Sequence, residues 1–205
     1  MSYLRGSAAK VLPFLWRSDL APRIVVHSDS DWLLPRSQSG VYVCVEDAWT
    51  DPGDPSGACL PIGWNSTKQS VQTDSSTAAE LVAAHLAVKW GARLALRYAP
   101  YVTADFAAGK PTVAPADLPP PLVLIDNTVC LGVCKGEPEP DAWFWYSKAV
   151  GGRTGLLMAC ADAGLVTFTK IDTKLNRADG LTKAFPVSEF VADGKAQQLG
   201  VWESP

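Results

Sequence analysis

Residues 74–98 read DSSTAAELVAAHLAVKWGARLALRY, and this run decides the fold because the pattern changes from strand to helix where it begins. The Asp and Ser residues at its start are typical N-caps of a helix. An apolar stripe follows at steps of three and four residues, formed by Ala79, Ala83, Leu86, Trp90 and Leu94. This spacing places the five side chains on one helical face, so we expect the longest helix of the protein here.

The sequence before this helix has the pattern of β-strands. Residues 23–29 (RIVVHSD), 40–46 (GVYVCVE) and 60–66 (LPIGWNS) are rich in β-branched and apolar residues and are separated by polar or Pro-rich loops. Successive short strands joined by loops are typical of an antiparallel meander. We therefore expect three neighbouring antiparallel strands.

The sequence after the helix alternates between strand and helix patterns. Residues 121–126 (PLVLID) and 165–171 (LVTFTKI) resemble strands. Helical segments are expected between Asn127 and Gly136, within residues 142–162, and over residues 177–184. Three glycines within 142–162 weaken the helical pattern there. The order predicts an α/β fold with a five-stranded mixed sheet, three antiparallel strands followed by two more, and helices on both faces.

Length and composition favour one globular domain. The chain has 205 residues, 47% of them apolar and 19% charged, which suffices for one sizeable core. We expect a single domain over residues 1–205, in which 1–22 form an N-terminal extension and 187–205 a C-terminal tail. Stretches rich in proline predict inserted loops at residues 47–59, 100–120 and 136–141.

Charge and cysteine content limit the functional classes. Five cysteines without a close CxxC pair fit a reducing compartment better than a disulfide framework. Apolar runs stay well short of the roughly 20 residues that a membrane helix needs. We therefore expect a soluble, intracellular protein, cytoplasmic or nuclear, without a small-molecule cofactor. The net charge of −3 argues against a protein that binds nucleic acid mainly by neutralising many phosphates, since domains that bind in this way are usually basic.

Three acidic residues lie where predicted elements meet loops. Asp29 ends the first strand, Glu80 lies in the first turns of the long helix, and Asp126 ends the fourth strand. Side chains at strand ends and helix starts converge on a common crevice in α/β sheets. Carboxylate oxygens are the ligands that hard divalent cations prefer. The pattern therefore predicts a metal site, for Mg²⁺ or Mn²⁺.

Six segments along the chain form a pattern when they are taken together. In chain order they are HSDSDW (27–32), RSQSG (36–40), GWNSTKQ (63–69), DSSTAAELVA (74–83), IDNTVC (125–130) and NRADGLTKAFP (176–186). These segments resemble the RNase H domain of copia-type retrotransposon polyproteins. SYLRGS (2–7) resembles the segment that leads out of the reverse transcriptase in those polyproteins. The resemblance implies an RNase H-like fold and a partner that is an RNA–DNA hybrid, with a reverse transcriptase domain or a larger complex as a further partner.

The resemblance also implies a set of catalytic residues. An acidic quartet transfers onto Asp29, Glu80, Asp126 and Asp179, the last of which periodicity alone does not single out. These residues would bind two ions for hydrolysis of the RNA strand, with Asp29 bridging the ions. The chain departs from the family where a Lys-His pair is usual, because it has Lys148 and Ala149 there. Its only histidines, His27 and His85, do not lie in a loop near the last carboxylate.

Candidates for nucleic-acid binding each have a structural alternative. Ser75, Ser76 and Asn127 adjoin the carboxylates and could contact a nucleic-acid backbone, or could cap helices. Lys89, Arg93 and Arg97 share a helical face that could meet phosphates, or could be solvated. We assign Asp31 to a supporting or capping role beyond the end of the first strand.

Three other features have a structural explanation. Trp143, Phe144, Trp145 and Tyr146 could stack on bases, but packing in a core is the more common fate of such residues. Cys130 and Cys134 lie one helical turn apart without nearby histidine or cysteine partners, which does not favour zinc. We expect His85 to be a packed or exposed residue.

Two readings of the function follow. The first is a two-metal endonuclease that hydrolyses the RNA strand of RNA–DNA hybrids. The second is a retroelement-derived RNase H-like module that is kept as a structural or protein-interaction subunit, with weak or no nuclease activity. The acidic net charge, the missing histidine and the Pro-rich loops favour the second. A variant of the first keeps the fold and acts on single-stranded or structured nucleic acid instead.

Overall fold

The computed structural model describes residues 22–52, 54, 59–98, 119–137 and 148–183. Outside these residues lie the predicted N-terminal extension apart from Pro22, the C-terminal tail and the aromatic run at 143–146. Residues 53, 55–58, 100–118 and 138–141 of the three predicted loops lie outside them as well. The division of the whole chain into one domain with insertions therefore stays a prediction.

A five-stranded sheet forms the centre of the described part. Its strands are β1 (Pro22–Asp31), β2 (Gln38–Asp47), β3 (Cys59–Lys68), β4 (Leu122–Ile125) and β5 (Thr167–Lys170), in the spatial order β3-β2-β1-β4-β5. β1 pairs with β2, and β2 with β3, in antiparallel fashion, whereas β4 runs parallel to both β1 and β5. The predicted mixed sheet of three antiparallel strands followed by two more is confirmed.

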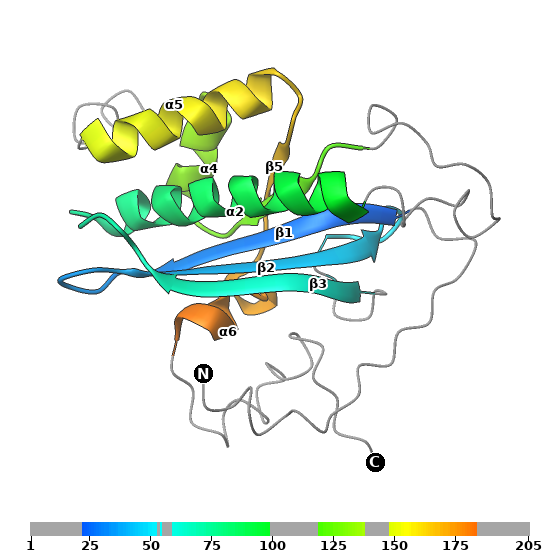
Figure 1. Ribbon diagram of the computed structural model, residues 1–205, viewed down its shortest axis with the longest axis horizontal. Coiled ribbons are helices and arrows are strands. Elements are labelled where there is room, and N and C mark those ends of the chain that lie inside the picture. The colour runs from blue at the N-terminus through cyan, green and yellow to red at the C-terminus, as the bar shows by residue number, and fades with distance from the viewer. Residues whose placement is uncertain (1–21, 53, 55–58, 99–118, 138–147, 184–205) are drawn as a thin grey trace, which may run out of the picture.

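Helices cover both faces of this sheet (Figure 1). One face carries α2 (Ser76–Tyr98), α4 (Thr128–Cys134) and α5 (Lys148–Asp162). The other carries α6 (Asp179–Thr182), which follows a short 3₁₀ turn, η4 (Thr173–Leu175). Among the described residues, no helix combines the length and hydropathy that crossing a membrane requires.

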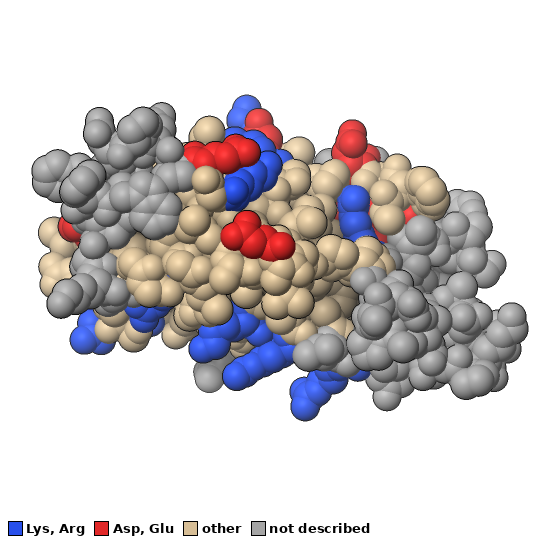
Figure 2. Space-filling view, turned by 90° about the horizontal axis from the view of Figure 1, so that it is seen from above, with Lys and Arg blue, Asp and Glu red and all other residues tan. Residues whose placement is uncertain are grey.

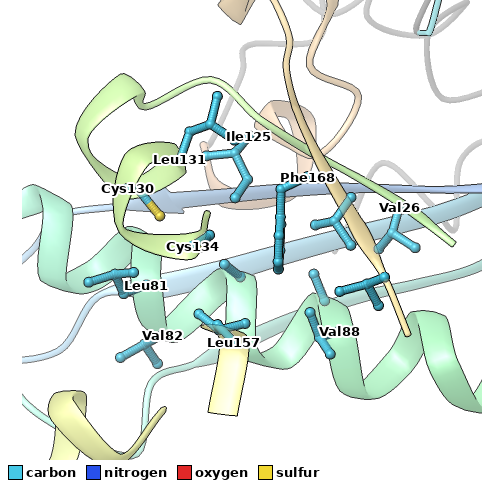
Figure 3. Close-up of a cluster of buried hydrophobic side chains, with 14 of the residues drawn as sticks. Val26, Leu81, Val82, Val88, Ile125, Cys130, Leu131, Cys134, Leu157 and Phe168 are labelled. Carbon is cyan, nitrogen blue, oxygen red and sulfur yellow. The ribbon is translucent and has the colours of Figure 1, made fainter. Parts of the chain in front are cut away.

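The main core lies between the sheet and the three helices of the first face (Figure 3). Leu81, Val82 and Val88 of α2 pack against Val26 and Ile125 of the sheet, and α4, α5 and β5 contribute Cys130, Cys134, Leu157 and Phe168. Burial of these apolar side chains is the main stabilising contribution here. A smaller cluster on the opposite face joins Val25, Tyr42 and Leu124 to Ala178 and Leu181 around α6. This second cluster attaches α6 to the sheet.

The structure corrects two boundaries. β1 continues to Asp31, so the prediction that Asp31 lies beyond the strand end is wrong; the antiparallel pairing with β2 extends to the Asp31–Gln38 pair. Its Oδ1 accepts a hydrogen bond from the backbone N of Gln38 at 2.5 Å, which fits the predicted capping role. The closing helix predicted over residues 177–184 is shorter, because α6 covers only Asp179–Thr182.

The glycines of α5 do not interrupt this helix. α5 runs without a break through Gly151, Gly152 and Gly155. A methyl group added at any of the three would meet nothing within 4 Å. The helix continues because Val150 and Leu157 are buried in the core, and such tertiary contacts outweigh a low intrinsic helix propensity.

Candidate metal centre

Three of the predicted carboxylates meet at one end of the sheet. Asp29 lies near the end of β1, Asp126 follows the last residue of β4, and Glu80 lies in the second turn of α2. β1 and β4 are parallel neighbours in which Ser28 is opposite Ile125, so the residues after both arrive at the same edge. One oxygen from each of the three carboxylates lies within 4.8 Å of the others. The convergence expected from the ends of these elements is therefore present.

Asp29 is a buried acid, with 4% of its surface exposed. The Thr182 hydroxyl donates a hydrogen bond to its Oδ2. Burial, followed by the nearby carboxylates of Asp126 and Asp179, raises the pKa of Asp29 to about 6, and the Thr182 hydrogen bond opposes this shift. A carboxyl group in such surroundings binds a proton more readily than usual, and a nearby cation would favour its charged form.

Glu80 is in a still less favourable environment for a charged carboxylate. Its Oε1 accepts a hydrogen bond from the backbone N of Ser30 at 3.4 Å. Its Oε2 is buried and has no hydrogen-bond partner among the described residues. Burial, together with Asp29 and Asp126, raises the pKa of Glu80 to about 9. A buried carboxylate oxygen without a partner is costly, and a divalent cation held by the three acids would satisfy it.

Asp179, the fourth predicted ligand, lies beside this group without joining it. Its carboxylate is not among the oxygens that lie within 4.8 Å of one another. Its Oδ1 forms an ion pair with Nζ of Lys183, one turn further along the chain. Asp179 still acts on the group electrostatically, because it contributes to the raised pKa of Asp29. The structure thus brings together three of the four predicted acids and places the fourth next to them.

Hydrogen bonds to β1 fix the segment that carries Asp179. Nδ2 of Asn176 donates to the carbonyl oxygen of Ser28 at 2.9 Å, and the backbone N of Arg177 donates to Nδ1 of His27 at 3.2 Å. Both acceptor residues immediately precede Asp29. The same few residues of β1 therefore position Asp29 and the start of α6.

Two residues of the site were not identified from the sequence. Thr182 holds Asp29, and Gly40, opposite Asp29 in β2, leaves room for α6. A Cβ on Gly40 would lie 2.7 Å from the carbonyl oxygen of Ala178 and 2.8 Å from Cγ2 of Thr182. Both residues lie within segments that carry the family resemblance, RSQSG and NRADGLTKAFP. That resemblance was the available signal, but it gave neither residue a role.

A second buried polar cluster lies on the α6 face of the sheet. His27, Cys44 and Glu46 have ligand atoms within 4.8 Å of one another, and Arg23 and Arg177 each place a guanidinium nitrogen 3.9 Å from Glu46. Because Nδ1 of His27 accepts the Arg177 N–H, the proton of the neutral ring lies on Nε2. Burial lowers the pKa of His27, which favours this neutral form. With no ring lone pair left, His27 is unsuited to bind a metal, and we assign the cluster a structural role.

The candidate nucleic-acid contacts are mostly capping or exposed residues. Oγ of Ser75 accepts a hydrogen bond from the backbone N of Ala78 at 3.2 Å, and Oδ1 of Asn127 accepts from that of Cys130 at 2.9 Å. These bonds cap α2 and α4. Ser76, Lys89 and Arg93 are exposed on α2. Their contact with nucleic acid stays a prediction.

Comparisons with known proteins give a likeness in overall structure. No protein-family model matches the chain, and no curated protein matches it. The N-terminal RNase H domain of Rv2228c from Mycobacterium tuberculosis, solved as a fusion with maltose-binding protein, is 13% identical, with a TM-score of 0.46 over 86% of this chain and 99% of that one. RNase H1 from Halobacterium salinarum NRC-1 is 13% identical, with a TM-score of 0.47 over 83% and 98%.

A third solved structure is LC11-RNase H1 in complex with an RNA/DNA hybrid. It is 12% identical, with a TM-score of 0.46 over 78% of this chain and 93% of that one. Identities and TM-scores this low carry no argument about function. The fold described above therefore rests on the order and direction of the strands and on the placement of the helices.

Proposed function

We propose that this protein is a metal-dependent ribonuclease H that hydrolyses the RNA strand of RNA–DNA hybrids and is of the retroelement type. The observation that carries the proposal is the convergence of Asp29, Glu80 and Asp126, in which a buried oxygen of Glu80 has no partner among the described residues. The sequence resemblance adds the substrate class and Asp179. A reverse transcriptase domain or a larger complex is the further partner that the resemblance favours.

The three clustered carboxylates fit a divalent cation such as Mg²⁺ or Mn²⁺, and the proposed function requires two such ions. Asp29 would contribute to the sites of both ions, Glu80 and Asp126 would each complete one of these sites, and Asp179 would help to hold one of the ions. When bound, the ions supply Lewis acidity to the attacking and leaving oxygens of the phosphodiester. Thr182 keeps the Asp29 carboxylate in place by donating to Oδ2. Lys183, half exposed beside Asp179, contributes positive charge at the edge of the acidic group.

Cleavage of a hybrid with one labelled strand tests the proposal. We expect Mg²⁺ or Mn²⁺ to support cleavage of the RNA strand of an RNA–DNA hybrid, and less or no cleavage of duplex DNA, duplex RNA and single strands. Asp126→Asn keeps the shape of the side chain, and we expect it to abolish cleavage. Absence of cleavage with either ion, or equal cleavage by the Asp126→Asn variant, contradicts the proposal.

One observation favours a second candidate function, a retroelement-derived module with a structural or protein-interaction role. Asp179 is already paired with Lys183 and lies outside the group of three carboxylates. A module of this kind would show no rise in melting temperature with Mn²⁺ and no affinity for a hybrid. Measurement of both on the same preparation separates the two candidates.

A further inference from the structure

A cavity of about 440 Å³ lies against the C-terminal half of α2. It is lined by Trp90, Arg93, Leu94 and Arg97, which follow one another at helical steps of three, one and three residues and so share one face. Its size is within the range of sites that bind small molecules or parts of larger ones. Two apolar side chains and two guanidinium groups therefore border the same hollow.

Gly63 of β3 lies against the apolar side of this cavity. A Cβ on Gly63 would lie 3.0 Å from Cδ1 of Leu94 and 3.6 Å from Cζ3 of Trp90. The two side chains thus rest directly on the backbone of the edge strand. Trp90 packs on this backbone and against the main core, and it also lines the cavity next to the two arginines.

Among the described residues, the side chains that line the cavity carry positive charge, although the chain as a whole is acidic. α2 has one acidic residue, Glu80, near its start, whereas Lys89, Arg93 and Arg97 are exposed along its second half. None of the three cations forms an ion pair with an acidic residue of the described segments. Figure 2 shows basic side chains following one another along the lower edge of the helical face, with the acidic side chains away from that edge. Such a row of cations favours a ligand that carries several negative charges.

A structural role explains only part of this arrangement. Basic residues near the C-terminus of a helix interact favourably with its dipole, which accounts for Arg97 as the basic residue of the last turn. The dipole does not account for Lys89 and Arg93. Packing against the core accounts for the buried part of Trp90 but not for the part that borders the cavity. Arginine beside an aromatic ring is the combination that binds unpaired nucleotides, because the ring stacks on a base while the guanidinium groups bind phosphates.

We propose that this cavity binds single-stranded nucleic acid, with one base on Trp90 and the adjoining phosphates on Arg93 and Arg97. A paired base inside a duplex is stacked between its neighbours and cannot enter a hollow, so the site selects unpaired nucleotides. Arg93 lies thirteen residues after Glu80, which is about 20 Å along the helix axis. The site is thus separate from the carboxylates, and binding at it does not depend on the proposed catalysis.

Binding of an oligothymidylate of about 12 nucleotides, followed by fluorescence anisotropy in EDTA, tests the proposal. EDTA removes any contribution of metal at the carboxylates, so failure of the nuclease and failure of this site are distinguishable. We expect the double variant Arg93→Gln/Arg97→Gln to bind at least tenfold more weakly than the wild type. The slope of log affinity against log salt should fall by about 1.4, since two phosphate contacts are lost.

Control variants distinguish binding at this specific site from nonspecific attraction to positive charge. Arg36→Gln/Lys135→Gln removes two exposed positive charges elsewhere, and we expect it to bind like the wild type. Trp90→Phe keeps an aromatic ring in place, and we expect it to reduce the preference for oligothymidylate over an abasic strand of the same length. Equal binding by the wild type and the Arg93/Arg97 variant overturns the proposal. So does equal affinity for a blunt duplex, or an equal loss in the Arg36/Lys135 variant.

Discussion

Gly40 lies directly opposite Asp29 across the β1–β2 pairing, and its missing side chain lets α6 approach the acidic group. A Cβ at this position would lie 2.7 Å from a backbone oxygen of Ala178 and 3.1 Å from Cβ of Leu181. Backbone atoms cannot move aside as the end of a flexible side chain can. The position of Thr182 next to Asp29 therefore depends on a glycine in the neighbouring strand.

The Gly40→Ala substitution tests this relationship. We expect it to lower the free energy of unfolding by about 1–3 kcal/mol through overpacking, and to reduce metal affinity because Thr182 is displaced. Urea unfolding measures the first effect and the melting temperature with and without Mn²⁺ the second. Unchanged stability and an unchanged Mn²⁺ response would show that α6 is not held against Gly40.

Gly155→Ala makes the same substitution as Gly40→Ala, but at a helical position where space is open. Gly155 is exposed within α5, and a Cβ there would meet nothing within 4 Å. We expect the free energy of unfolding to rise by up to about 1 kcal/mol, because alanine has the higher helix propensity. The same urea experiment measures it. A loss of stability would mean that α5 is not a regular helix at this position.

Glu80→Gln should stabilise the metal-free protein at neutral pH. The pKa of Glu80 is raised from 4.5 to about 9, so the folded state binds a proton more tightly than the unfolded state does. The stability of the wild type therefore falls as pH rises from 4.5 to about 9, by up to about 3 kcal/mol at pH 7. Glutamine is neutral throughout this range. Urea unfolding of the wild type and of Glu80→Gln in EDTA at pH 5 and pH 8 measures this pH dependence. If the free energy of unfolding changes equally with pH in both proteins, the raised pKa of Glu80 is contradicted.

Metal binding should release protons. Near pH 7 Glu80 holds a proton and Asp29 does so in part, since their pKa values are about 9 and about 6. Metal binding requires the charged carboxylates, so affinity should increase with pH. Calorimetric titration with Mn²⁺ in two buffers of different ionisation enthalpy measures the number of protons released. Asp29→Asn should weaken Mn²⁺ binding. If the heat of Mn²⁺ binding to the wild type is the same in both buffers, no proton is released and the expectation is contradicted.

The buried cluster around Glu46 should be sensitive to loss of its acid. Glu46 lies 3.9 Å from guanidinium nitrogens of both Arg23 and Arg177, and 3.8 Å from Nε2 of His27. Glu46→Gln removes the carboxylate charge that these buried cationic groups face, and we expect a loss of roughly 3–5 kcal/mol. Exposed Glu137 is the control, and Glu137→Gln should have little effect. Equal urea midpoints for the two variants would count against the role of the cluster.

The sequence by itself predicted the elements and three of the four acidic positions. Strand and helix periodicity are local properties, and they gave the three strands, the long helix and the placement of Asp29, Glu80 and Asp126 at element ends. The parallel strand ends of an α/β sheet then predicted that these acids converge. Asp179 came from the family resemblance, because nothing local distinguishes it from other acidic residues near a short helix.

Tertiary structure decided which residues surround those acids and how they ionise. Gly40 and Thr182 meet Asp29 only because β2 and α6 fold against β1, and no periodicity encodes a contact between residues 153 positions apart. The raised pKa values of Asp29 and Glu80 arise from burial and from the charges of neighbouring carboxylates, which come together only after folding. The cavity beside Trp90 of α2 likewise depends on the packing of this helix against Gly63 of β3. Local patterns depend on neighbours in the chain, whereas a site depends on neighbours in space.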